Sequence, residues 1–182
     1  MIVCGSATSW MIHNIVNSKG GLHDRITHEM HLRPFTLRET EQYLQSRRFK
    51  WTRISIIQTY MALGGIPYYL SLLDSRKSFA MNIDRLFFSD EEELRREYKR
   101  LYSTLFKSPE SYMTIVNALS KAREGMTRKE LMHALGKDSS GSLSKKLEDL
   151  INCDIIRKYV VREQKVKSKS AIYQLIDFYS LF

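Results

Sequence analysis

Basic residues gather in the last third of the chain in a pattern that could hold the phosphates of a nucleic acid. From Lys107 to Phe182 the sequence has 14 Lys and Arg against 9 Asp and Glu, and the whole chain carries a formal net charge of +9. Cations that neutralise phosphates give salt-dependent binding with little preference for sequence. The candidate contacts occupy an expected helix and the polar stretch that follows it: Ser142, Lys145 and Lys146, then Arg162, Lys165, Lys167 and Lys169.

The expected helix also has features that argue against reading a DNA sequence. Glu148 and Asp149 add negative charge to it, and no Arg or Asn among its early residues could form paired hydrogen bonds with base edges. We therefore expect any DNA contact to be mainly with phosphates. A protein partner that docks on the same region is the other interpretation.

Three short helices followed by two β-rich runs must position these cations. Pro109 starts the first helix, Thr127 and Glu130 form a capping box for the second, and Ser139 or Ser140 begins the third. The β-rich runs cover residues 155–161 and 171–176. This order of helices and strands is typical of a winged-helix domain.

No constellation for catalysis or metal binding stands out along the chain. A P-loop needs the spacing G-x-x-x-x-G-K-[ST], and none of the 8 glycines provides it. His23, His28 and His31 do not form a metal set, because a strand over residues 27–32 would place the last two on opposite faces. We therefore expect no catalytic residue and no metal site in this chain.

Helices with clear start and stop signals occupy the middle of the chain. Thr36 and Glu39 form a capping box for the first. Apolar residues at helical spacing from Ile54 to Leu63 predict a second helix, which ends at Gly64–Gly65, and Pro67 opens a third. The glycine and proline indicate a tight connection between two helices.

The segments on either side of the long charged helix have weaker signals. Residues 75–88 are irregular by pattern, although they are apolar enough to pack against the protein. Ser89 and Glu92 form a capping box for the long helix that follows. The helical pattern breaks at residues 106–109, where we place a domain boundary.

The order of five segments resembles the C-terminal portion of the archaeal-type P-loop ATPases of the AAA+ and STAND group, which have a helical lid and a winged-helix tail. The segments are "GSATSWM", "GLHDRITHEMHLRPFTLRETEQYL", "LGGIPYYL", "NIDRLFF" and "EEELRREYKRLYSTLF". The ending "YQLIDFYSLF" is similar to the continuation of that family beyond the wing. The resemblance runs through most of the chain, and its most specific part is the combination of these segments.

The resemblance implies nucleotide-binding roles for three residues in an intact ATPase. Ser6 matches the first sensor, Arg25 an arginine near the nucleotide or a neighbouring subunit, and Pro67 the proline whose ring faces adenine. Each also has an ordinary explanation, as a turn serine, a solvated arginine and a helix-start proline. In the family the P-loop and the magnesium-binding strand lie upstream of the matching part. ATP and Mg²⁺ are thus cofactors of the intact family, and none is expected in this chain.

These patterns together predict a mostly α fold with a small β component. Residues 1–35 would be a remnant of an α/β NTPase core, 36–106 a helical lid and 107–182 a winged-helix domain. We expect the C-terminal lid and winged-helix part of an ATPase, without independent catalysis. The alternative is a stand-alone winged-helix transcriptional regulator that binds DNA.

Location and assembly follow from the same composition. No apolar run is long enough to span a membrane, no signal peptide is visible, and the 2 cysteines lie far apart. We therefore expect a cytoplasmic protein without a membrane partner. Because strands in the first 35 residues would lack sheet neighbours, we expect them either to repack on the helices or to pair across a homodimer.

Overall fold

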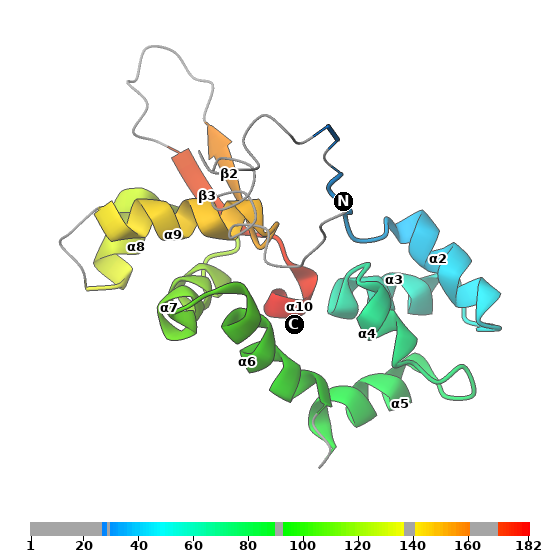
Figure 1. Cartoon of the computed structure of the whole chain (residues 1–182). Helices are drawn as coiled ribbons and strands as arrows, with labels where there is room; N and C mark the ends of the chain where they lie inside the picture. Colours follow the sequence, from blue (N-terminus) through cyan, green and yellow to red (C-terminus); the bar gives the residue numbers. More distant parts are fainter. Residues whose placement is uncertain (1–26, 29, 90–92, 137–140, 161–170) are drawn as a thin grey trace.

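The computed structural model describes residues 27–28, 30–89, 93–136, 141–160 and 171–182. This part of the chain is mostly helical and has a small three-stranded antiparallel sheet at one end (Figure 1). The predicted fold class, mostly α with small β, is confirmed. None of the described helices is long and apolar enough to cross a lipid bilayer.

The first helices begin and end where their local signals predict. At the start of α2 (Leu37–Ser46), the Thr36 hydroxyl accepts from the Glu39 N–H at 3.3 Å, and the Glu39 carboxylate accepts from the Thr36 N–H at 2.8 Å. The next helix, α3 (Arg53–Leu63), ends at Gly64, whose φ of 63° favours glycine. Pro67 occupies the first turn of α4 (Pro67–Ser71).

Residues 79–88 are helical, so the irregular structure predicted there is wrong. Helix α5 (Phe79–Ile83) starts at Ser78, whose hydroxyl accepts from the Met81 N–H at 3.3 Å. It continues directly into a π-helical turn, η2 (Asp84–Phe88). The widened turn changes the residue period part-way through the segment, which hides the helical pattern.

In the C-terminal part of the described chain, four helices precede the two longer strands of the sheet, and a fifth, short helix follows them. The four helices are α6 (Glu93–Leu105), α7 (Pro109–Ser120), α8 (Arg128–Ala134) and α9 (Gly141–Asn152). The capping box of α8 is present, with Glu130 accepting from the Thr127 N–H at 2.7 Å. The predicted starting residues Glu92, Ser139 and Ser140 lie outside the described residues.

The sheet has the order β1-β3-β2, in which all neighbouring strands are antiparallel. Strands β2 (Ile156–Val160) and β3 (Ala171–Leu175) match the two predicted runs, and the buried Ile156 lies opposite the buried Leu175. Strand β1 (Met126–Thr127) was not predicted, because two residues carry no period of their own.

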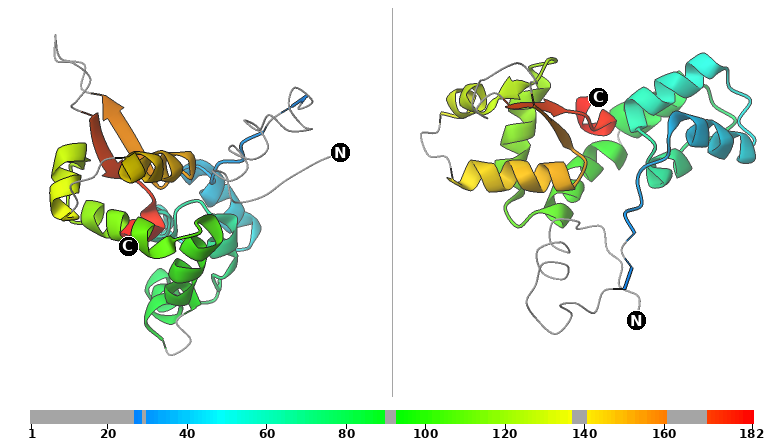
Figure 2. Two further views of the ribbon diagram at one scale, coloured as in Figure 1. Left: turned by 60° about the vertical axis from the view of Figure 1, so that its left-hand side comes forward. Right: turned by 90° about the horizontal axis from the view of Figure 1, so that it is seen from above.

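Two clusters of buried apolar side chains form the interior. The first core, built mainly from α2–α6, contains Leu44, Phe49, Ile56, Ala62, Leu63, Tyr69, Leu70, Leu73, Ile83, Leu86, Leu94 and Tyr179. The second core contains Tyr102, Phe106, Ile115, Val116, Leu119, Leu131, Leu143, Leu147, Leu150, Ile155, Ile156 and Leu175. Tyr98 and Leu101 of α6 pack against both cores. The last helix, α10 (Phe178–Leu181), contacts α3 and α7. The views of Figure 2 place it between the helices around the first core and those around the second.

The segment before α2 is extended chain. Residues 27, 28 and 30–35 form neither helix nor strand, so the strand predicted over residues 27–32 is wrong over its described positions. The Phe35 N–H donates to the Gly65 carbonyl at 2.8 Å, which ties this segment to a helix end instead of a sheet. Residues 1–26 and 29 lie outside the described residues, and the three-part domain division stays a prediction.

Candidate functional site

Helix α9 presents a basic side opposite its buried leucines. Leu143, Leu147 and Leu150 fill the second core, whereas Ser142 and Lys145 are exposed. Lys146 is half-buried, and its spacing from Ser142 puts it on the same side of the helix. Three residues predicted to contact DNA are therefore brought together on α9.

Asp149, one turn further along this side, is only 5% exposed. Its carboxylate accepts a hydrogen bond from the Tyr112 hydroxyl of α7 at 2.8 Å. Burial, reinforced by this hydrogen bond and by the charge of Asp149, raises the pKa of the Tyr112 phenol. Asp149 therefore fixes α9 to α7, and of the two acidic residues that argued against DNA binding only Glu148 is exposed.

Strand β2 adds two exposed cations that the sequence analysis missed. Arg157 and Lys158 are exposed, and β2 packs against α9. The Arg157 guanidinium lies 5.8 Å from the centre of the Tyr159 ring, and it donates to the Tyr159 hydroxyl at 3.4 Å. The signal was present as the two charges inside "IIRKYVV", but the run was interpreted only as a strand. Arg157 and Lys158 are successive residues of a strand, so their side chains point to opposite faces of the sheet. We call Ser142, Lys145, Lys146, Arg157 and Lys158 together the basic surface, which takes in both faces of β2.

The remaining predicted contacts lie outside the described residues. They are Arg162, Lys165, Lys167 and Lys169, predicted to contact DNA, and Ser6 and Arg25, whose nucleotide roles rest on the resemblance. His23 also lies outside. His31 lies beside Asp154, with 3.4 Å between His31 Nε2 and Asp154 Oδ2. Within the part of the chain that the structure describes, no group of three His, Cys, Asp or Glu side chains could hold a metal ion.

Pro67, the described member of the predicted nucleotide contacts, is exposed at the start of α4, and the next residue, Tyr68, is 52% exposed. Gly65, just before this turn, is buried beneath the Phe35 backbone: a Cβ added there would lie 1.8 Å from the Phe35 carbonyl oxygen. The close crossing holds the turn before Pro67 in place and explains why residue 65 is glycine.

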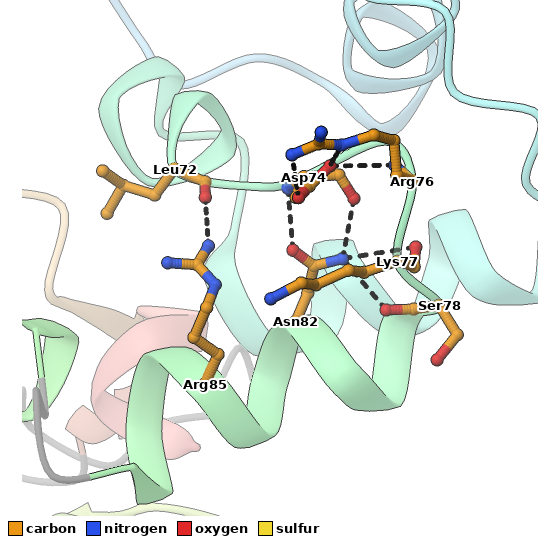
Figure 3. A network of polar contacts seen from close by, with 7 residues as sticks. All are labelled: Leu72, Asp74, Arg76, Lys77, Ser78, Asn82 and Arg85. Atoms are coloured by element: carbon orange, nitrogen blue, oxygen red, sulfur yellow. Dashed lines mark hydrogen bonds and ion pairs between the residues drawn. The ribbon is translucent and has the colours of Figure 1, made fainter.

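A polar network fixes the loop between α4 and α5 (Figure 3). The buried Asn82 accepts from the Asp74 N–H at 2.8 Å and donates to the carbonyls of Asp74 and Ser78 at 3.0 and 2.9 Å. Arg76 donates to both carboxylate oxygens of Asp74, and these bonds lower the pKa of Asp74 to about 2. These bonds satisfy the backbone of the loop, so the network needs no ligand to explain it.

Comparison with known proteins supports a distant ATPase-like fold. No family model and no curated protein matches the chain. Among solved structures, it is similar to the Walker-type ATPase PabY2304 of Pyrococcus abyssi, with a TM-score of 0.65 and 18% sequence identity. The match covers 97% of this chain and 50% of that one, so the chain spans about half the length of the structure it matches.

Proposed function

We propose that the chain is the C-terminal, non-catalytic part of an ATPase of the AAA+ and STAND group. In this proposal residues 36–106 form the helical lid and residues 107–182 the winged-helix domain. The observation that carries it is the structural match, which extends over 97% of this chain and leaves half of a Walker-type ATPase uncovered. Because the 182 residues contain no P-loop spacing, the triphosphate would be held by residues outside them.

The lid would meet the nucleotide at the turn that starts α4. Pro67 is exposed there, on a turn held by the contact between Gly65 and Phe35. In the intact ATPase its ring would face adenine, with Ser6 and Arg25 closer to the phosphates. ATP and Mg²⁺ would then bind the intact assembly and not this chain alone.

The winged-helix domain would contact DNA through the basic surface. Exposed Lys145 on α9 and exposed Arg157 and Lys158 on the adjacent β2 support this proposal, as does the burial of Asp149. Such cations bind phosphates without reading bases, so the binding would be weakly sequence-dependent and strongly salt-dependent.

Adding ATP and Mg²⁺ to the purified chain tests the first part of the proposal. We expect neither ATP hydrolysis nor saturable nucleotide binding. The sequence lacks the P-loop spacing that arranges backbone N–H groups around the phosphates. Sustained ATP hydrolysis that copurifies with the chain would contradict the proposal.

Duplex binding by fluorescence anisotropy tests the DNA contact. We expect the double variant Lys145→Glu and Arg157→Glu to bind at least tenfold more weakly at about 50 mM salt, with a salt slope smaller by about two. The matched control reverses Arg38 and Lys50, two exposed cations at α2 and just after it. An equal loss of DNA affinity in both variants would show that the basic surface is not the interface. A strong preference of the parent protein for one DNA sequence would favour the stand-alone regulator.

A further inference from the structure

Helix α3 is apolar on two opposite faces, and only one of them is buried. Ile56, Ala62 and Leu63 belong to the first core and are 5%, 1% and 0% exposed. On the other side, Ile54, Ile57 and Met61 are 69%, 43% and 59% exposed. The spacing of these last three places them in one row along the helix, which we call the α3 stripe.

A helix that is apolar all round is normally buried all round. Among the described residues, the α3 stripe contains no charged side chain: Gln58 lies beside it, and Arg53 at its N-terminal end is 3.6 Å from Glu41. Removing an aliphatic side chain from water favours association. A partner that covered all three would therefore gain substantially from an apolar contact.

We propose that the α3 stripe is the docking surface for a nucleotide-binding domain that carries Walker motifs and is supplied from outside these 182 residues. This inference rests on the proposed function and adds the face through which the two parts meet. The match covers 97% of this chain but 50% of the ATPase, so the uncovered part of that protein is as long as the matched part. A domain of that length would need a contact surface on the part of the ATPase to which this chain corresponds.

The chemistry of the α3 stripe selects a folded domain over a nucleic acid. Phosphates require cations, and the basic surface lies on α9 and β2, which contribute to the second core. An uncharged row of Ile and Met fits an apolar protein surface, where interface centres are depleted of charge. The stripe and the basic surface would thus serve two different partners.

Site-specific photo-crosslinking in the source organism tests this docking surface. Benzoylphenylalanine in place of Met61 should crosslink to a peptide from a domain that contains a Walker A sequence. The same probe in place of Val160, which is 70% exposed on β2, is the matched control and should not. Ile54→Glu with Ile57→Glu should reduce the Met61 crosslink at least tenfold while the far-UV circular dichroism stays unchanged, because both side chains are exposed.

The outcomes separate this inference from the proposed function. A Walker-containing partner that copurifies with the chain but does not crosslink at Met61 overturns the docking surface alone. A crosslink to a second copy of this chain, or to a protein without Walker motifs, overturns the assignment of the occupant and counts against the proposed function as well.

Discussion

At the scale of single residues, Asn82 holds more of the backbone than any charged group in its loop. Replacing it by Ala would leave the Asp74 N–H without its acceptor, whereas the carbonyls of Asp74 and Ser78 would each lose one donor and keep a backbone N–H. We expect Asn82→Ala to lower the free energy of unfolding by about 1–3 kcal/mol, because one unsatisfied buried donor costs about that much. Urea denaturation measures this.

The control for Asn82 lies in the same network. Arg76 is exposed, and its ion pair with Asp74 is at the surface. Arg76→Ala should therefore cost much less stability than Asn82→Ala. Similar losses in the two variants would show that the loop is held mainly by charge and not by the buried amide.

Two glycines provide a second comparison at this scale. Gly65→Ala puts a methyl group against the Phe35 backbone, whereas the space around Gly141 is open. We expect Gly65→Ala to destabilise the protein by about 1–3 kcal/mol, and Gly141→Ala, in a helix, to be neutral or slightly stabilising. Thermal unfolding of both variants checks this, and equal midpoints would contradict the close crossing at Gly65.

Residue roles could be predicted from the sequence where the partner is close along the chain. The capping boxes at Thr36 and Thr127 depend on a residue three positions away, and both are present. Asp149 was interpreted as a surface charge, because its partner Tyr112 is 37 residues distant and no local pattern indicates the pairing. Of the candidate site, the cations on α9 were found and those on β2 were missed.

At the scale of elements, α6 and α10 join through buried tyrosines that respond to pH. Burial raises the pKa of Tyr102 above its ordinary value of about 10, and its hydroxyl lies 3.3 Å from the Ser180 hydroxyl of α10. Because the folded-state pKa is the higher one, the unfolded chain ionises first. The stability that the neutral phenol contributes is complete below pH 10 and is lost as pH rises further.

Tyr102→Phe tests this element contact. Between about pH 10 and 11, the free energy of unfolding of the variant should fall less steeply, by about 1 kcal/mol per pH unit, than that of the parent protein. Phe106→Leu, which changes a buried ring beside Tyr102 but removes no ionisable group, is the control and should leave the slope unchanged. Parallel curves for all three proteins would contradict the role of Tyr102.

Element types were predicted well where one period covers the whole element, as in α2, α7 and β2. The prediction failed at residues 79–88, where a π turn changes the period, and at β1, whose two residues are defined by pairing with β3. In α3 the helix was predicted, but the pattern cannot say which of its two apolar faces is buried. That choice depends on packing against α2, α5 and α10.

At the scale of the whole molecule, the last helix returns from the second core to the first. Tyr179 of α10 belongs to the first core, although the strand just before it belongs to the second. Its ring lies 4.7 Å from that of Tyr69, and its hydroxyl donates to the Leu94 carbonyl. No sequence pattern in the last residues indicates this return, because a four-residue helix has too little length to show a preferred face.

The return of α10 predicts how the molecule unfolds. Tyr179→Ala removes a large buried side chain that joins the two cores, so we expect a loss of about 3–5 kcal/mol and, in calorimetry, a first core that melts before the second. Phe182→Ala, at a position 54% exposed, is the control and should cost about 1 kcal/mol or less while one transition remains. A single transition with an unchanged midpoint in Tyr179→Ala would mean that α6 alone couples the two cores.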